Sequence, residues 1–233
     1  MAAREQATAE LTAAECRLVV SAIRQSFDSV AKMFDTSKYP EAVYRRIRLA
    51  FKTPNHVRPD DLRDALYWKF GHLGKEGRIP TTHRKLISEL QRAWPRLVRD
   101  LPDAPDQTFA LINDRVGGPT RFITTAFVVH LIHPSHVPII DQHNFRAVNS
   151  LIQGVRPSWT SKKKPSSWSD IVLVHAFMSA VRSAWRHEAP ATTPTLRRLD
   201  QFLMRYGKDI KRRHNQRLHP TAAVDRMRVS GRG

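Results

Sequence analysis

Apolar residues recur at three- and four-residue intervals along most of the chain, and prolines or glycines separate one such stretch from the next. This spacing places the apolar side chains on one face of an α-helix. No stretch shows the clean two-residue alternation of a half-buried β-strand. The pattern predicts an all-α fold, with helices over residues 12–34, 40–51, 59–70, 81–94, 106–116, 121–132, 141–152, 168–185 and 195–210.

Two of these helices carry clear local signals. Thr12 followed by Glu15 is typical of a capping box, in which each side chain bonds the backbone N–H of the other residue. Residues 121–132 are almost all apolar, so this helix is expected to be buried on most sides. The first helix is expected to bury one apolar stripe, which comprises Leu18, Val19, Ala22, Ile23, Phe27, Val30 and Phe34.

The chain is strongly basic, with a formal net charge of +18 on 233 residues and a sequence pI near 11.0. Such a field attracts polyanions, and nucleic acid is the expected partner. No apolar run is long enough to span a bilayer, and no N-terminal segment has the order of a signal peptide. We therefore expect a cytoplasmic, nucleoid-associated protein that binds DNA and not a membrane.

Composition divides the chain into three parts. Residues 1–11 are expected to form a flexible N-terminus, residues 12–210 an α-helical domain, and residues 211–233 a disordered basic tail. A loop within the domain contains serines, prolines and three consecutive lysines. These lysines, Lys162, Lys163 and Lys164, are predicted to contact nucleic acid.

The residues best suited to chemistry lie between 117 and 148. Gly117 and Gly118 form a turn between two predicted helices, where backbone N–H groups can approach a phosphate because no Cβ atom intervenes. Asp141 stands at the start of a later helix, where backbone donors can hold its carboxylate. Such a carboxylate can stabilise the sugar cation that forms when a base leaves deoxyribose, and it can orient the attacking water.

This region resembles the helix-hairpin-helix DNA glycosylase superfamily, which includes endonuclease III, the adenine-mismatch glycosylase and the oxoguanine glycosylases. The resemblance rests on Pro138-Ile139-Ile140-Asp141 followed by Phe145-Arg146-Ala147-Val148, and it covers about residues 111–152. The segments 66–71 and 200–208 look like elements of bacterial relatives of the oxoguanine type. The resemblance implies two helical lobes around a cleft, excision of a flipped base, and Asp141 as the catalytic aspartate.

The hairpin departs from the family pattern. The usual Gly-x-Gly is here Gly117-Gly118-Pro119, and Thr120, Arg121 or Phe122 stands where bifunctional members have a nucleophilic lysine. Arginine stays protonated and cannot form a Schiff base, so water is the expected nucleophile unless Lys69 or Lys162–Lys164 reaches the site. Gly117, Gly118 and Thr120 are predicted to hold a phosphate, with Arg121 adding charge. The alternative is a DNA-binding protein that keeps the fold but has no catalytic activity.

Metal chemistry is a further alternative. Cys16 is the only cysteine, which excludes an intramolecular disulfide and a thiolate-held metal centre. His130, His133, His136 and His143 lie close in sequence and could serve a metal-dependent nuclease, but Pro134 interrupts their helix. We therefore expect packed or surface histidines and predict neither a metal nor a cofactor.

Overall fold

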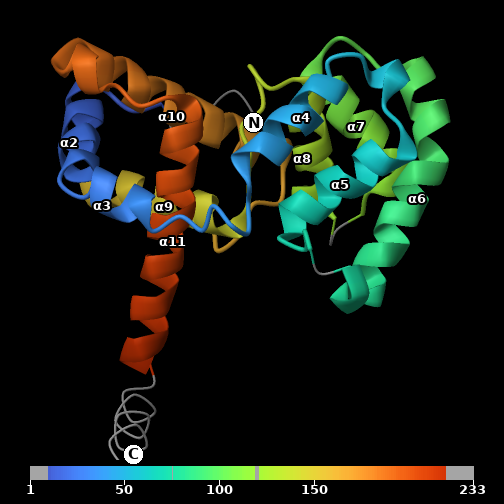
Figure 1. The fold of residues 1–233 in the computed structure, drawn as a ribbon. Coiled ribbons are helices and arrows are strands. Elements are labelled where there is room, and N and C mark those ends of the chain that lie inside the picture. The colour runs from blue at the N-terminus through green and yellow to red at the C-terminus, as the bar shows by residue number, and fades with distance from the viewer. Residues whose placement is uncertain (1–9, 75, 119–120, 219–233) are drawn as a thin grey trace, which may run out of the picture. The chain divides into compact units, whose positions relative to one another are not determined.

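The computed structural model describes residues 10–74, 76–118 and 121–218, and within these ranges the protein is all-helical with no strand (Figure 1). The chain forms two compact units. Asp35–Ile140 and Pro165–Ser179 belong to the first unit, and Leu11–Phe34, Asp141–Lys164 and the chain from Ala180 onward belong to the second. The α-helices are α2 (Ala13–Arg24), α3 (Phe27–Lys32), α4 (Glu41–Ala50), α5 (Pro59–Phe70), α6 (Thr81–Leu97), α7 (Pro105–Val116), α8 (Phe122–Ile132), α9 (Gln142–Val155), α10 (Trp168–Glu188) and α11 (Leu196–Leu218).

Helix α8 lies in the core of the first unit. Every residue from Phe122 to Leu131 except Ile123 is buried, which confirms the expectation drawn from its apolar sequence. Helix α7 packs on α8, and α4, α5, α6 and α7 pack against one another in chain order. Arg48 of α4 donates to the carbonyl groups of His130 and Leu131 at the end of α8, 3.4 and 3.3 Å away. This contact satisfies acceptors that a helix C-terminus leaves without partners.

Helix α6 continues past residue 94, where the sequence predicted its end, and includes Pro95. It runs to Leu97 and passes into a 3-10 turn over Val98–Asp100. Proline removes only one backbone donor, and here it does so in the last turn of the helix. The buried side chains Leu90, Trp94 and Leu97 hold this turn in place.

The second unit is built from α2, α3, α9, α11 and the end of α10. Helix α11 packs on α9 and α3, and α2 also packs on α9 and α3. Phe27 is central to this core, with its ring 5.1 Å from Trp185 and 5.3 Å from Phe202. Arg156, at the end of α9, donates to both carboxylate oxygens of Glu15 over 2.8 and 2.7 Å and so ties α9 to α2.

The capping box at the start of α2 is confirmed, but the predicted helix over residues 12–34 is two helices. Thr12 and Glu15 exchange backbone-to-side-chain hydrogen bonds of 2.8 and 3.2 Å. The chain turns between α2 and α3, so one apolar stripe cannot run along both helices. Leu18 is 59% exposed and Ala22 is also exposed, and the buried positions of α2 are Cys16, Val19, Val20 and Ile23.

Three further helix ends predicted from the sequence were wrong. Helix α9 extends past Gly154 to Val155, α10 reaches Glu188, and α11 runs to Leu218 instead of Ile210. Residues 211–218 are therefore helical and not part of a disordered tail, while residues 219–233 lie outside the described part of the chain. Asp209 stabilises the extension through pairs with Arg205 at 3.1 Å and Arg212 at 3.9 Å, the spacing at which side chains on a helix meet.

No helix among the described residues is long and apolar enough to cross a membrane.

Candidate functional site

Asp141 is the N-cap residue of α9. Its backbone is extended, with φ −145° and ψ 177°, and its Oδ1 accepts hydrogen bonds from the backbone N–H groups of His143 and Asn144 at 2.6 and 2.9 Å. The Asn144 side chain accepts a bond of 2.8 Å from the Asp141 backbone N–H and completes a capping box. The carboxylate is thus held in one orientation by the first turn of the helix.

Only one oxygen of this carboxylate serves the cap. Within the described residues, the hydrogen bonds to the Asp141 side chain all reach Oδ1. The side chain is only partly buried, so solvent reaches the site. Oδ2 therefore remains for a water molecule or for a developing positive charge, while Oδ1 fixes the position of the group.

A buried network of polar side chains connects α11 to the first turn of α9 and supports that turn. Asn144 is 1% exposed and donates through Nδ2 to Oδ1 of Asp200, which lies 3.2 Å away. Arg197 donates to the other Asp200 oxygen over 2.6 Å. Charge-assisted hydrogen bonds in a poorly solvated setting are strong and directional, so this network fixes the Asn144 rotamer and, through it, the Asp141 cap.

The same turn is in close contact with Gly207 of α11. A Cβ atom at position 207 would overlap the backbone carbonyl of His143, so only glycine allows the two helices to approach this closely. Arg146 adds a bond of 3.4 Å from its guanidinium to the Gly207 carbonyl oxygen. The sequence segment 200–208 thus supplies both the polar and the steric support for the start of α9.

Positive charge surrounds this turn. Burial lowers the pKa of His143, the Asp141 carboxylate opposes that shift, and the cationic Lys208, Arg146 and Lys211 lower the pKa further. These three cations and Asp141 all belong to the second unit. A polyanion that approached Asp141 would therefore meet positive side chains from both α9 and α11.

The sequence did not single out Asn144, Asp200 or Gly207 as site residues. A signal for Asn144 exists, because asparagine three positions after an N-cap aspartate can complete a capping box. Gly207 interrupts an otherwise helical pattern, and glycine inside a helix often marks a close approach of another backbone. Asp200 lies 56 residues from its partner Asn144, and nothing local to it predicts that contact.

The hairpin residues lie in the first unit. Gly118 has φ +133°, a conformation that favours glycine, and a Cβ atom on Gly117 would overlap the backbone of Asn113. The Gly117 N–H donates to the Asn113 carbonyl over 2.9 Å, and the Arg121 N–H donates to the Gly118 carbonyl over 2.9 Å. The Gly117 amide, which was expected to contact a phosphate, is therefore already bonded within the hairpin, and so is the neighbouring amide of Arg121. Thr120 lies outside the described residues.

The Arg121 side chain connects the hairpin to α6. Its guanidinium pairs with Glu89 of α6 at 2.5 Å and donates to the Val116 carbonyl oxygen at 3.0 Å. The Arg121 side chain is 28% exposed, so the pair remains in contact with solvent. Its observed contacts join α6 to the end of α7.

The predicted lysines occupy two different settings. Lys162, Lys163 and Lys164 are exposed in a loop that Trp159 anchors to α9, through a 2.9 Å bond to the side chain of Asn149. Lys69 instead lies in the first unit, where its ammonium donates to the Ile140 carbonyl over 2.9 Å and lies 5.2 Å from the centre of the Phe127 ring.

The histidines between 130 and 143 do not form a metal centre in the part of the chain that the structure describes, where no three His, Cys, Asp or Glu side chains gather suitably. His130 is 5% exposed and uses both ring nitrogens, at 2.7 Å from the Tyr44 hydroxyl and 2.6 Å from the Val137 carbonyl oxygen. His133 bonds the Thr108 hydroxyl at 2.9 Å. Both histidines are therefore packed within polar networks.

Comparisons of the chain with protein-family models, with curated proteins and with solved structures found no match.

Proposed function

We propose that the protein binds duplex DNA and hydrolyses the N-glycosidic bond of a base flipped out of the stack, with Asp141 as the catalytic carboxylate. The observation that carries this proposal is that the two oxygens of the Asp141 carboxylate have different environments. Oδ1 is held by two backbone N–H groups, and Oδ2 remains available in a partly exposed position. A carboxylate that is fixed in this way stabilises a positive charge without having to reorient during the reaction.

The reaction follows from ordinary glycoside chemistry. The bond between C1′ and the base nitrogen breaks, the bonding electrons leave with the base, and the base takes up a proton. Oδ2 of Asp141 stabilises the resulting sugar cation and orients a water molecule, whose oxygen bonds to C1′. This water gives up one proton, which balances the proton taken up by the base. The products are a free base and an abasic site, and the strand stays intact because no lysine forms a Schiff base in this scheme.

The charge of the molecule supports DNA as the substrate. The formal net charge is +18, and Arg146, Lys208 and Lys211 act electrostatically on the turn that carries Asp141. Attraction to backbone phosphates provides affinity independent of sequence and holds the duplex while a base is extruded.

The test is an assay of base release on duplexes with damaged or mismatched bases, comparing the wild-type protein with Asp141→Asn. Asparagine keeps the N-cap oxygen, so the fold is retained while the charge on Oδ2 is lost. The matched control is Asp106→Asn, an exposed carboxylate in the first turn of α7. We expect release to fall by about 100-fold or more in Asp141→Asn and to stay at the wild-type level in Asp106→Asn.

The other outcomes are equally informative. Release that is unchanged in Asp141→Asn contradicts the role of this residue. Tight, salt-sensitive binding without base release from any duplex identifies a DNA-binding protein without catalytic activity. Absence of DNA binding rejects the whole proposal.

A further inference from the structure

The first unit contains an open groove rich in arginine. Its volume is about 610 Å³, and it lies between α6, the C-terminal end of α7 and the hairpin at Gly117. Four arginines line it against two carboxylates, Glu89 and Asp114. The arginines are Arg92, Arg96, Arg115 and Arg121.

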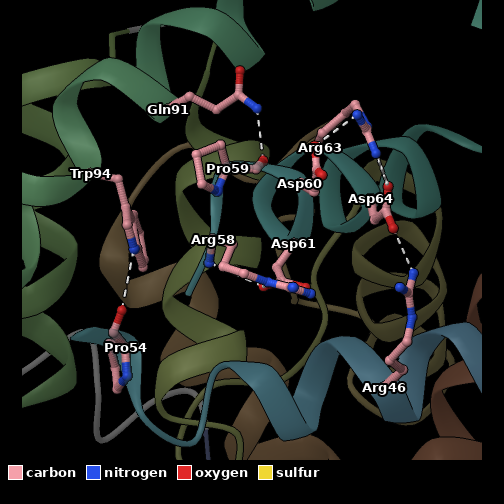
Figure 2. Close-up of polar contacts among 10 residues, drawn as sticks. All are labelled: Arg46, Pro54, Arg58, Pro59, Asp60, Asp61, Arg63, Asp64, Gln91 and Trp94. Atoms are coloured by element: carbon pink, nitrogen blue, oxygen red, sulfur yellow. Dashed lines mark hydrogen bonds and ion pairs between the residues drawn. The ribbon is translucent and has the colours of Figure 1, made fainter. Parts of the chain in front are cut away.

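Helix α6 presents two of these arginines because its other face is anchored. Figure 2 shows Gln91 donating to the Pro59 carbonyl oxygen over 2.7 Å and the Trp94 indole donating to the Pro54 carbonyl oxygen over 3.3 Å. Arg92 and Arg96 are exposed and are one helical turn apart. Residues at this spacing lie side by side on a helix surface, so both guanidinium groups can contact the same ligand.

Three arginines elsewhere in the first unit are already neutralised by carboxylates. In Figure 2, Arg46 pairs with Asp64 at 2.6 Å, and Arg63 pairs with Asp60 at 2.9 Å and with Asp64 at 3.2 Å. Arg58 pairs with Asp61 at 3.3 Å.

Two of the arginines that line the groove also form ion pairs within the protein. Arg121 pairs with Glu89 at 2.5 Å, and Arg115 pairs with Asp100 at 2.7 Å. Over residues 10–74, 76–118 and 121–218, neither Arg92 nor Arg96 has an ion-pair partner. Arg92 donates from Nε to the Ser88 carbonyl oxygen over 3.3 Å. The hydrogen bond from Arg121 lowers the pKa of Glu89, and the charge of Arg92 helps to lower it. The Nη groups of Arg92 and the guanidinium of Arg96 form no ion pair with a described residue and can bind an anion from outside the chain.

The hairpin leaves few backbone donors for such an anion. The N–H groups of Gly117 and Arg121 are bonded within the hairpin, and Pro119 has no N–H group. A ligand in the groove must consequently be held mainly by guanidinium groups. Guanidinium binds phosphate oxygens in pairs, with strong charge-assisted hydrogen bonds.

We propose that this groove binds the DNA backbone through Arg92 and Arg96, which contact phosphodiester groups of the duplex. The inference rests on the proposed function, since it assumes that the polyanion is DNA. Asp114 is exposed in the same groove and weakens the site by repelling the phosphate.

The test measures affinity for an undamaged labelled duplex as a function of salt, by fluorescence anisotropy. The test variant is the double substitution Arg92→Gln, Arg96→Gln. The control, Arg17→Gln with Arg186→Gln, removes the same charge from exposed positions on α2 and α10 that make no ion pair with a described residue. Each phosphate contact contributes about 0.9 to the slope of log affinity against log salt concentration.

We expect the test variant to lose about 1.8 from that slope and to bind about tenfold more weakly at low salt. The control should keep the wild-type slope, and Asp114→Asn should bind more tightly than the wild type. A slope in the test variant that equals that of the wild type overturns the proposal. So does an equal loss of slope in the control, because it would show that only total charge matters.

Two further measurements distinguish DNA-backbone binding in the groove from a small-phosphate site and from the glycosylase reaction. Inorganic pyrophosphate, added at the phosphate concentration of the duplex, should not displace DNA, and displacement would identify a site for small phosphates instead. Base release by the wild type is measured in parallel. If the test variant loses slope but the wild type releases no base, the groove binds DNA and the glycosylase reaction is rejected. If the wild type releases a base but the slope of the test variant is unchanged, the glycosylase reaction is retained and the groove is rejected.

Discussion

Gly207 of α11 lies against the backbone carbonyl of His143 in α9, and the space between them is too small for a Cβ atom. His143 follows Asp141 by two residues and donates its backbone N–H to the Asp141 carboxylate. The position of the candidate catalytic group therefore depends on a residue that is more than sixty positions away in the sequence.

The first prediction concerns Gly207→Ala. Alanine normally stabilises a helix relative to glycine by about 1 kcal/mol. Here the added methyl group must push α11 away from α9, so the free energy of unfolding should fall by about 1–3 kcal/mol. Urea denaturation measures the change. Gly154→Ala in α9 is the matched control, because a Cβ atom there meets nothing within 4 Å, and a destabilised control would contradict the explanation.

The second prediction concerns Asn144→Asp. The substitution places a carboxyl group beside Asp200 at a position where Asn144 is 1% exposed. Burial and repulsion disfavour the charged form of the new group, so the protein should lose about 3 kcal/mol of stability near pH 7. The loss should shrink as the pH falls and the new carboxyl takes up a proton.

Unfolding curves at pH 7.5 and pH 5 test this prediction. Asn215→Asp on the exposed end of α11 is the control and should change stability by less than about 0.5 kcal/mol. A deficit in Asn144→Asp that is identical at both pH values would rule out charge repulsion as its cause.

The third prediction concerns the pair of Glu15 and Arg156. Hydrogen bonds from the Arg156 guanidinium and from Thr12 lower the pKa of Glu15 from 4.5 to about 2. Because the pKa is lower in the folded state, the pair stabilises the protein above pH 4.5, and this stability is lost as the pH falls from 4.5 to about 2.

Glu15→Gln should remove about 1 kcal/mol of stability at neutral pH, since the pair is still reached by water. It should also flatten the acid limb of the stability curve. Glu188→Gln is the control, because its 3.9 Å contact with Arg24 is long and solvent-exposed. An acid limb that is equally steep in Glu15→Gln would contradict the assignment.

The fourth prediction concerns four histidines. Burial is the first cause that lowers the pKa of His83, His133, His143 and His175 below 6.5. These histidines stabilise the fold in their neutral form, so the free energy of unfolding should decrease as the pH falls below 6.5. NMR titration of the imidazole C–H signals measures each pKa directly. A value at or above 6.5 for any of them would contradict burial as the dominant influence on the pKa of that ring.

Local patterns in the sequence were sufficient to predict the all-helical fold class, the approximate positions of most helices, the Thr12 capping box and the burial of α8. Each depends on side chains within about four residues of one another, which is the range over which helix periodicity and caps act. Leu18 was placed wrongly because periodicity alone cannot detect the turn between α2 and α3. The Asp141 cap was also predictable, since aspartate before an apolar helical pattern is a common N-cap.

The surroundings of Asp141 and the arginine groove were not predictable in this way. Asp200 and Gly207 meet α9 only because α11 folds back on it. The charges of Arg46 and Arg92 look alike in the sequence, yet Arg46 is neutralised by Asp64, 18 positions away, whereas Arg92 is not. Which cations remain for a ligand is decided by packing between helices, and sequence spacing does not encode it.

The burial of Cys16 gives the protein an internal reporter. Its thiol is 6% exposed, and burial raises its pKa, so the reactive thiolate is scarce in the native state. A thiol-directed reagent can therefore modify the chain only when α2 opens. Because Cys16 is the only cysteine, the labelling rate measures the opening of this one helix directly, in unmodified protein and without an introduced probe.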